Sequence, residues 1–573
     1  TMSVLDHAIG SFASGSTLST IEIDFGTLMQ GSGTASRTVS VFNRAGSLGT
    51  AWTAKLDLDG VTANAPGVFS TTLAPFTSLA SGSSRAFTLA MATATSGVYS
   101  GTYSLNLSDE DLPGAANQGM LVSVRGIVAA PSLASSWTPT TGGSWTTVTS
   151  WSGGVPNSSA SVATIGSAFA GPATITLDAP ITLNILSCPA TGTLAAGTGG
   201  SLAFAGTNAT VMVSGSLTIS APLSGGFLKG GGGTLVVTSS NTAPGLITVA
   251  GGGLDVNNAS FARPGRGYAV AAGATLSLSG TTAIAFSTTG TTTLAGDGLV
   301  RVSLGSTLTN ANIAGQGDLV LQLGPAATIE VNGVMGAGWS AGRGTIDWTG
   351  NQADLVLGPA GRFNVQSAPR VFVDALLGSG SITKTSTGSS VITIGVAGGS
   401  GTFAGTIATQ LGTISLVKAG AGTQVLAAAT TFTGSTSVTQ GVLQIGHANA
   451  LSASAVSIAA AATLSVAPQV QATVPGLVNG GLVDVGLGML TIASGQTPAG
   501  VVEQIIAGAA SGGTSGIASA AAAARGGGFT VGWLDNGDGS MTVGYAAPGD
   551  TNLDWSIDIL DVADFLGSGD FNT

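Results

Sequence analysis

Lys229-Gly-Gly-Gly-Gly233-Thr234 is the first of three copies of one short pattern, in which a lysine, three small residues, a glycine and a hydroxyl residue follow one another. The later copies are Lys384-Thr-Ser-Thr-Gly388-Ser389 and Lys418-Ala-Gly-Ala-Gly422-Thr423. Each copy leads into a short strand-like segment, such as Val391-Ile-Thr-Ile394. The pattern therefore indicates degenerate repeats of a turn and a strand, each of which buries its apolar face against the neighbouring copies.

Two further phrases support this repeat. Phe403-Ala-Gly405-Thr and Phe432-Thr-Gly434-Ser follow the second and third copies, and the copies at 229 and 418 both end in a Gly-led strand, Gly253-Leu-Asp-Val256 and Gly441-Val-Leu-Gln-Ile445. Val, Ile and Leu alternate with Thr and Ser through most of the chain, as in half-buried strands. We therefore expect an all-β protein, because Gly and Thr are poor helix formers.

The chain is long, rich in glycine and poor in charge. Its 573 residues include 91 glycines, and only 7% are charged. This length predicts several domains or one elongated repeat array. The net charge of −11 without a basic patch excludes nucleic acid as a partner. Cys188 is expected to be a buried, inert thiol.

The termini and hydropathy predict a secreted protein that does not span a membrane. Apolar runs fall short of the roughly 20 residues that cross a bilayer. Thr1 is not an initiator, so we expect a portion of a longer precursor.

Residues 1–130 are expected to form an immunoglobulin-like β-sandwich, because about seven alternating segments are separated by turn signals. The phrases Asp24-Phe-Gly, Val41-Phe-Asn-Arg44 and Val124-Arg-Gly-Ile-Val128 resemble bacterial choice-of-anchor surface domains. That resemblance implies a role in spacing or adhesion. The acidic cluster Asp109-Glu-Asp111 is interpreted as a solvated turn, with a cation site as the alternative.

A linker is expected over 131–142 and a β-solenoid over 143–497. Trp145 and Trp151 lie at its start, where they would cap the open end or, alternatively, stack on sugar rings. This Trp-x5-Trp entry, with the Lys-x3-Gly repeats and the Phe-x-Gly phrases, resembles the autotransporter-associated β-strand repeats of bacterial passenger proteins. The resemblance implies a right-handed parallel β-helix that serves as an adhesin or surface fibre.

Residues 498–547 are expected to form helical segments followed by a β-hairpin. Val501, Val502, Ile505 and Ile506 give 498–506 an apolar helical face, and a second helix is predicted over Ile517–Ala524. The segment Asp535-Asn-Gly-Asp-Gly539 predicts the hairpin turn, because Asx-Gly pairs supply the positive φ that such turns need.

Residues 548–573 contain the one set of side chains with metal-ligand spacing. Oxygen-bearing residues occupy positions 1, 3, 5, 7, 9 and 12 of a loop, which is the spacing of a calcium loop followed by a helix. The predicted Ca²⁺ ligands are Asp550, Asn552, Asp554, Ser556 through its main chain, Asp558 and Asp561. Trp555 at the sixth position, where Gly is usual, and Asp561 in place of Glu predict weak binding, roughly 10⁻⁴ to 10⁻³ M.

Gly569-Asp-Phe-Asn572 then repeats the opening Gly549-Asp-Thr-Asn552. The pair resembles a type I dockerin that is truncated in its second copy. The resemblance implies a cohesin-like domain as a partner.

The leading hypothesis is a non-catalytic, extracellular structural or adhesive protein that self-assembles into a fibre or surface layer and is stapled by calcium. The first alternative is a polysaccharide lyase or hydrolase, although acids such as Asp347 and Asp354 are scattered singly rather than clustered as in such sites. The second is a monomeric adhesin that binds glycans, including cell-envelope polysaccharide, through Trp145 and Trp151.

Overall fold

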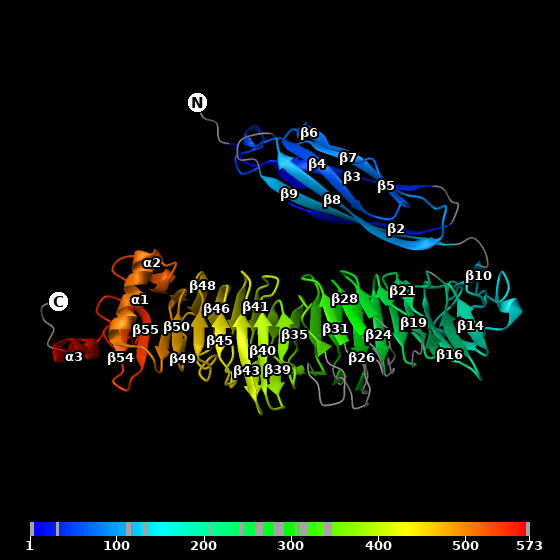
Figure 1. Cartoon of the computed structure of the whole chain (residues 1–573). Coiled ribbons are helices and arrows are strands. Elements are labelled where there is room, and N and C mark those ends of the chain that lie inside the picture. The colour runs from blue at the N-terminus through cyan, green and yellow to red at the C-terminus, as the bar shows by residue number, and fades with distance from the viewer. Residues whose placement is uncertain are drawn as a thin grey trace. The chain divides into compact units, whose positions relative to one another are not determined.

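The computed structural model describes residues 5–29, 34–110, 116–129, 134–206, 208–239, 245–257, 267–279, 283–284, 292–303, 307–308, 319–336 and 346–568. The chain separates into two compact units, the first made mainly of residues up to Ala134 and the second mainly of those from Ser135 onward. Figure 1 shows a twisted pair of sheets in the first unit and a long stack of short strands in the second.

The first unit is a β-sandwich. One sheet has the order β1 (Ile9–Ser11), β3 (Ala35–Arg44), β7 (Ser84–Met91) and β5 (Phe69–Thr71). The other has the order β2 (Thr20–Met29), β9 (Asn117–Ala129), β8 (Gly97–Asp109), β4 (Leu56–Asn64) and β6 (Phe76–Leu79), and a 3₁₀ turn, η1, covers Thr50–Trp52. Residues of both sheets, including Val41 and Val122, share one buried core. The predicted sandwich architecture is therefore present, with β2 parallel to β9 and the other described pairs antiparallel.

Asp109, the first residue of the acidic cluster at the end of β8, is buried rather than solvated. Asp109 is 3% exposed, and its carboxylate accepts hydrogen bonds from the Ala8 N–H (2.7 Å) and His7 Nδ1 (2.6 Å). These bonds, with one from Ala116, lower the pKa of Asp109 against the opposing effect of its burial. Asp111 lies outside the described residues. Asp109 thus ties the N-terminal strand to β8, because a buried carboxylate requires donors.

The second unit is a parallel β-solenoid with two long sheets. Among the described residues, one long sheet contains ten strands: β10 (Ala134–Ser136), β12 (Val162–Thr164), β15 (Ile185–Cys188), β18 (Thr210–Val213), β21 (Phe227–Gly230), β23 (Ile247–Val249), β25 (Gly267–Val270), β28 (Thr292–Gly296), β31 (Leu319–Leu323) and β34 (Ile346–Asp347). The other contains seventeen: β11 (Gly143–Ser144), β13 (Ala173–Leu177), β16 (Thr191–Ala196), β19 (Ser216–Ile219), β22 (Thr234–Val237), β24 (Gly253–Asn257), β26 (Thr275–Ser279), β29 (Leu299–Val302), β32 (Thr328–Val331), β35 (Asp354–Leu357), β38 (Leu376–Gly378), β41 (Gly401–Phe403), β44 (Thr423–Leu426), β46 (Gly441–Ile445), β48 (Ala462–Val466), β51 (Leu482–Asp484) and β53 (Gly516–Ala518).

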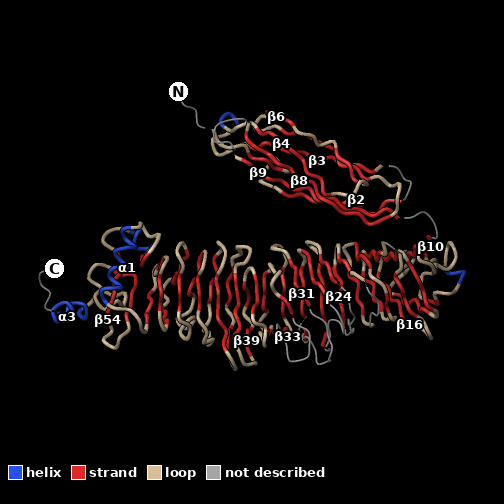
Figure 2. The backbone as a smooth tube through the Cα atoms, viewed as in Figure 1, coloured by secondary structure: helices blue, strands red, loops and turns tan. Residues whose placement is uncertain are grey.

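Shorter sheets complete the cross-section. As far as the structure describes them, they consist of β14 (Pro180–Leu183), β17 (Ser201–Phe204) and β20 (Leu223–Ser224); β27 (Ala283–Ile284), β30 (Thr307–Leu308), β33 (Val334–Gly336), β36 (Arg362–Asn364), β39 (Ser381–Lys384) and β42 (Thr406–Thr409); and β37 (Arg370–Val373), β40 (Ser389–Ile394), β43 (Thr413–Lys418), β45 (Thr436–Val438), β47 (Val456–Ile458) and β50 (Leu477–Asn479). Figure 2 shows these strands as successive rungs joined by short turns.

The register places identical kinds of side chain above one another. Leu217, Leu235, Leu254 and Leu276 occupy equivalent positions in four successive strands of the long sheet, and each is fully buried. In each of these strands, the residues on either side of the buried leucine face outward and are at least partly exposed. The apolar and hydroxyl alternation in the sequence therefore corresponds to the inside and outside of each rung.

Tryptophans close the first end of the solenoid. Trp137, Trp145 and Trp151 are at most 5% exposed, and the Trp145 and Trp151 rings lie 4.6 Å apart between centroids. The Trp145 Nε1–H donates to the Pro156 carbonyl (3.1 Å), and the Trp151 Nε1–H to the Trp145 carbonyl (2.7 Å). This burial leaves no ring face for a sugar, so the glycan-stacking interpretation is wrong and these residues form a cap. The expected linker over 131–142 is also too long, because β10 and Trp137 belong to the solenoid.

A hairpin closes the other end. The last solenoid strands β49 (Gln471–Val474) and β52 (Met489–Ile492) continue into β55 (Met541–Ala546) and β54 (Thr530–Asp535), with β52 and β55 antiparallel. Residues 498–547 therefore belong to the solenoid as its cap. The predicted first helix corresponds to α1 (Pro498–Ala510), but the second, α2, covers only Ala520–Arg525. Ile517 lies in β53 instead, because its side chain completes the solenoid core.

Helix α1 covers the edge of β53 at very short range. Gly508 is buried, and a Cβ there would lie 2.0 Å from the Ile517 carbonyl oxygen. Covering the last strand in this way protects an edge that would otherwise pair with another chain. None of the described helices is long and apolar enough to cross a bilayer.

Replacing Gly508 with Ala should therefore move α1 away from β53 and lower stability by about 1–3 kcal/mol. A decreased thermal midpoint in circular dichroism would show this. Gly500→Ala in the same helix is the matched control, since a Cβ there meets only the Thr497 Oγ1 at 3.2 Å. Equal midpoints for the two variants would contradict the close contact.

Candidate functional site

The predicted calcium loop lies between the hairpin cap and helix α3 (Ile559–Ser568). The loop is built from successive Asx turns, in which a side-chain oxygen accepts the N–H two residues later. Asn552 accepts from the Asp554 N–H (3.0 Å), Asp554 from the Ser556 N–H (2.8 Å) and Asp558 from the Leu560 N–H (2.7 Å). Alternate residues of the loop thus carry side-chain oxygens that fold the backbone into consecutive turns, which is the residue spacing of a calcium loop.

The sixth position has the geometry usually supplied by glycine. Trp555 has a φ of 69°, in the left-handed region, and Leu553 has a φ of 58°. Left-handed φ is costly for bulky residues and persists only where neighbouring contacts compensate. Trp555 therefore adopts the sharp turn for which glycine is usual at this position.

Asp561 is the organising residue of the loop. It is 3% exposed, its Oδ1 accepts from the Thr551 N–H (2.7 Å), and its Oδ2 accepts from the Asp558 N–H (2.9 Å). These backbone donors lower the pKa of Asp561. Because Asp561 lies in the first turn of α3, its negative charge also interacts favourably with the helix dipole.

Asp550 is a buried carboxylate with one oxygen left unpartnered. It is 7% exposed, and its Oδ1 is buried without a hydrogen-bond partner. Burial raises the pKa of Asp550, and the nearby charges of Asp561 and Asp554 raise it further. Backbone hydrogen bonds from Asp554 and Trp555 oppose this rise in pKa only in part. A buried carboxylate with one unpartnered oxygen beside two other carboxylates is costly, and a cation would relieve that cost.

The described residues contain no group of three or more His, Cys, Asp or Glu side chains arranged to hold a metal ion. The oxygen donors of the loop are of the kind that calcium prefers, but their carboxylates do not converge on one point. The repeated phrase at 569–572 lies outside the described residues. The calcium site remains a prediction.

The loop is docked on the hairpin through one side chain. Leu553 is 4% exposed and packs with Met489 and Ala546, with Leu534 beside them. It lies beneath Gly532, where a Cβ would come 2.5 Å from Leu553 Cδ2. The loop is therefore coupled to the end of the solenoid through an apolar contact.

The scattered acids of the solenoid have structural partners. Asp374 Oδ1 accepts from the N–H groups of Ala397 (2.7 Å) and Gly399 (2.8 Å), and Asp354 Oδ1 accepts from the Ala375 N–H (2.9 Å). Asp347 and Asp354 belong to different sheets. The stacking of rungs thus brings Asp354 near Asp374, whose charge adds to the effect of burial in raising the pKa of Asp354, rather than near Asp347.

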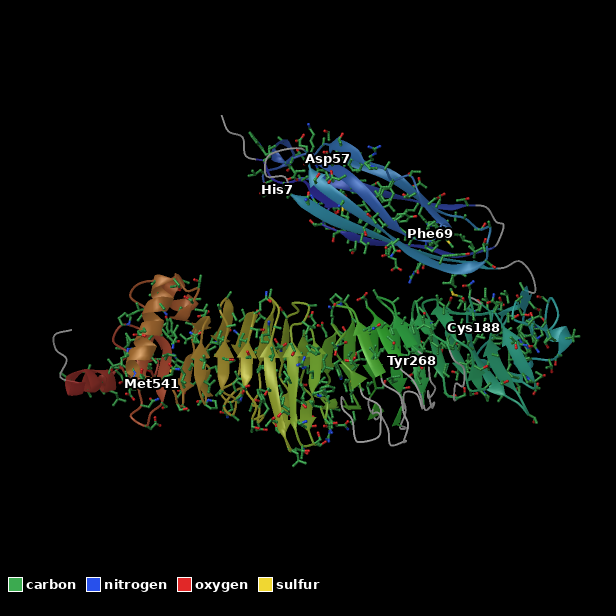
Figure 3. All side chains as sticks on the ribbon, viewed as in Figure 1. His7, Asp57, Phe69, Cys188, Tyr268 and Met541 are labelled. Carbon is green, nitrogen blue, oxygen red and sulfur yellow. The ribbon has the colours of Figure 1, made fainter. Side chains whose placement is uncertain are left out.

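Cys188 is buried in the solenoid, and Figure 3 labels it there. Burial raises its pKa to about 11. The prediction of an inert thiol is confirmed by this environment, because the thiolate is the reactive form.

The repeat lysines have a role that sequence reasoning missed. Lys229, Lys384 and Lys418 are all fully buried at the ends of strands. The Lys229 ammonium donates to the carbonyls of Gly231 (3.0 Å), Gly233 (2.6 Å) and Gly251 (2.8 Å). The Lys418 ammonium donates to the carbonyls of Ala419, Gly420 and Gln440.

Each of these two lysines joins consecutive rungs. Gly251 and Gln440 both lie 22 residues after their lysine, in the turn of the next rung. Lys384 instead reaches back to the Gln366 carbonyl and also bonds Ser390. We call these three arrangements the lysine corners. The only signal in the sequence was the recurrence of Lys before a glycine-rich turn.

Two segments, residues 227–256 and 416–445, match the passenger-associated-transport-repeat family. They contain the corners of Lys229 and Lys418. Together with the parallel solenoid, this match supports a β-helix of the bacterial autotransporter-passenger kind. Among solved structures, the ASH/PapD-like domain 7 of human CEP192 is similar with 13% identity, 21% of this chain, 87% of that chain and a TM-score of 0.16. None of the curated proteins compared matches the chain.

Replacing Lys229 with Met should keep the apolar stem but leave the carbonyls of Gly231 and Gly251 without their donor. We expect a loss of about 1–3 kcal/mol, measured as a lower melting temperature of the solenoid. Lys55→Met is the control, since the Lys55 side chain is 49% exposed and its ion pair with Glu110 lies at the surface. An unchanged midpoint for Lys229→Met would show that the corner does not contribute.

The corners also predict a pH dependence. Burial lowers the pKa of both Lys229 and Lys418 to about 8, below the ordinary value of about 10. Between these values the unfolded chain holds protons that the folded chain has released, so stability should rise from about pH 8 to about pH 10. Thermal midpoints across this range should rise less steeply in a Lys229→Met, Lys418→Met double variant. A parallel profile in that variant would assign the pH dependence to other groups.

Proposed function

We propose that this protein is a non-catalytic extracellular scaffold that presents a long, rigid solenoid at a bacterial surface. The observation that carries this proposal is the lysine corner in both family-matched repeats. These corners, with Asp354 and Asp374, commit buried polar groups to the backbone of the solenoid. Catalytic groups need freedom to meet a substrate, so this usage favours a structural role.

The proposal includes self-association into a fibre or layer. The tryptophan cap and the hairpin cap cover the ends of the solenoid, which disfavours direct stacking of rung on rung between copies. Contacts between copies would therefore use lateral faces or the C-terminal region. Negative-stain electron microscopy of the intact chain tests this: ordered filaments or sheets support assembly, and monodisperse rods at high concentration oppose it.

Calcium is proposed to staple the C-terminal loop to the solenoid. Asp550, Asn552, Asp554, Ser556 through its carbonyl, Asp558 and Asp561 would hold it. The unpartnered Asp550 Oδ1 supports this, because a cation would satisfy it and offset the repulsion among Asp550, Asp554 and Asp561. When bound, the ion supplies charge neutralisation rather than chemistry.

Replacing Asp550 with Asn should therefore separate the cost of the buried charge from the stabilisation by calcium. Without calcium the variant should be as stable as the parent protein or more stable, because a buried charge is removed, whereas millimolar calcium should no longer raise the melting temperature. Asp538→Asn is the matched control, because Asp538 lies in the hairpin turn and accepts from the Ser540 N–H (2.9 Å). A parent protein whose melting and calorimetric titration ignore calcium would refute the staple while leaving the scaffold role intact.

A further inference from the structure

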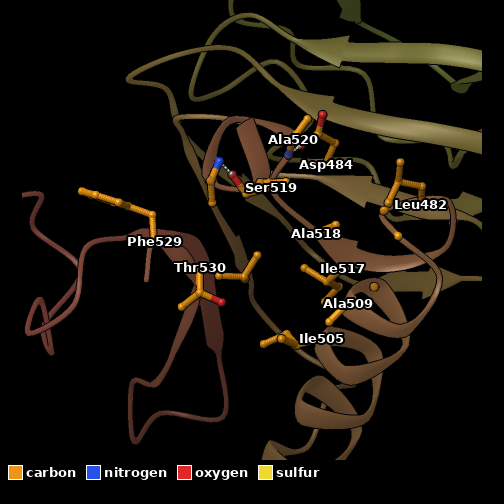
Figure 4. A pocket seen from close by; sticks show the side chains of 16 residues that line it. Leu482, Asp484, Ile505, Ala509, Ile517, Ala518, Ser519, Ala520, Phe529 and Thr530 are labelled. Atoms are coloured by element: carbon orange, nitrogen blue, oxygen red, sulfur yellow. Dashed lines mark hydrogen bonds between the residues drawn. The ribbon is translucent and has the colours of Figure 1, made fainter. Parts of the chain in front are cut away.

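Strand β54 has an open edge next to the covered edge of β53. It is the outermost strand of the sheet β49-β52-β55-β54. Helix α1 covers β53, whereas no described strand pairs with the outer side of β54. Figure 4 shows β54 with Thr530 on one side of a hollow and α1 with Ile505 and Ala509 on the other.

The hydrogen-bond alternation identifies which backbone groups point outward. Asn536 N–H donates to the Ser540 carbonyl (3.1 Å), and Tyr545 N–H donates to the Gly488 carbonyl (3.1 Å), so β55 uses even-numbered residues toward β54 and odd-numbered residues toward β52. In an antiparallel ladder, the odd-numbered residues of β54 then direct their N–H and C=O groups away from β55. Val531, Trp533 and Asp535 therefore present unpaired backbone groups, and Trp533 is 40% exposed.

An apolar groove of about 520 Å³ adjoins the start of this edge. Its walls come from β51, α1, β53, α2 and β54, and most of its lining residues are alanine, glycine or aliphatic. Phe529, Thr530 and Val531 form its β54 side. The groove and the free edge are thus continuous, which is the arrangement that strand addition uses: backbone groups bind the main chain and a hollow receives alternate side chains.

The charge of the groove is negative. Asp484 lines it, with its Oδ1 accepting from the N–H groups of Gly486 (3.0 Å) and Ala520 (2.9 Å), and the lining contains no Lys or Arg. The nearby Arg525 guanidinium is already stacked 4.0 Å from the Phe529 ring centroid and donates to the Tyr545 hydroxyl. A side chain with an apolar stem and a cationic head therefore complements the groove best.

We propose that the β54 edge and this groove form a docking site for an extended segment of a partner protein, in which apolar residues alternate with Lys or Arg. The segment adds as a strand to β54, its N–H and C=O groups pair with Val531 and Trp533, and one cationic side chain lies in the groove toward Asp484. None of the predicted calcium ligands lines the groove, and the proposal does not rest on the scaffold role.

The test uses the intact chain and three synthetic peptides. The probe is acetyl-Val-Lys-Val-Lys-Val-Lys-amide, the charge control has Glu in place of Lys, and the backbone control is the Lys peptide with alternate amides N-methylated. Binding is followed by calorimetry, and amide hydrogen exchange is measured at Val531 and Trp533. We expect saturable binding of the probe, slower exchange at both amides, and at least tenfold weaker binding of each control peptide.

A matched pair of variants tests the position of the site. Ala523 lines the groove and is exposed, whereas Ala524 is exposed but does not line it. Ala523→Trp should fill the groove and weaken the probe at least tenfold, and Ala524→Trp should leave the affinity unchanged, with unchanged melting temperatures showing that both fold. Equal binding of the N-methylated peptide, unchanged exchange, or equal affinities of the two variants would overturn the proposal. Dimerisation of the chain that Ala523→Trp abolishes would also overturn it, because the occupant would then be a second copy.

Discussion

The backbone hydrogen bonds between successive rungs are the constraint on which this solenoid depends. Each strand must lie directly on the strand of the preceding rung, so each turn must lie directly on the preceding turn. Side chains cannot fit where turn backbones touch: a Cβ at Gly233 would lie 2.0 Å from the Gly215 carbonyl. This stacking explains why the turns are rich in glycine. It also leaves carbonyl groups in the stacked turns without N–H partners, which destabilises the turns.

The lysine corners supply hydrogen-bond donors to these carbonyls. A buried ammonium can donate three hydrogen bonds, so one lysine satisfies carbonyls of two adjacent turns. Desolvation opposes this arrangement, as the lowered pKa values of Lys229 and Lys418 show. The chain tolerates that cost at a few rungs, where an apolar residue of the ladder is replaced: Lys418 stands between Ile394 and Val438.

The two ends of the solenoid are closed, and two groups with unused bonding capacity lie near the C-terminus. Both ends of the solenoid are closed by apolar packing, by tryptophans at the start and by α1 with the β54–β55 hairpin at the end. Two further features lie near the C-terminus: the loop in which Asp550 Oδ1 has no partner, and the open edge of β54. A capped solenoid that carries the Asp550 loop and the open β54 edge at one end is suited to present that end to ions or to partners.

Local pattern determined a large part of this architecture. Alternating apolar and hydroxyl residues specify which side of each strand is buried, the recurring Lys and Gly phrase marks the turns, and the Asx spacing after Gly549 specifies a curled loop before a helix, because these effects act between residues close in sequence. Tertiary structure decided the rest. A lysine is expected at the surface, and its burial follows only from the turn 22 residues later that stacks on it. Two tryptophans near Gly and Pro are compatible with a cap or with a sugar-binding surface, and only their burial distinguishes the two. Ile517 belongs to a strand because the last rung has an edge on which it can pair. For the lysines and for Ile517 the deciding contact comes from another rung, and for the tryptophans it comes from the packed end of the solenoid. The order of residues along the chain does not show these contacts.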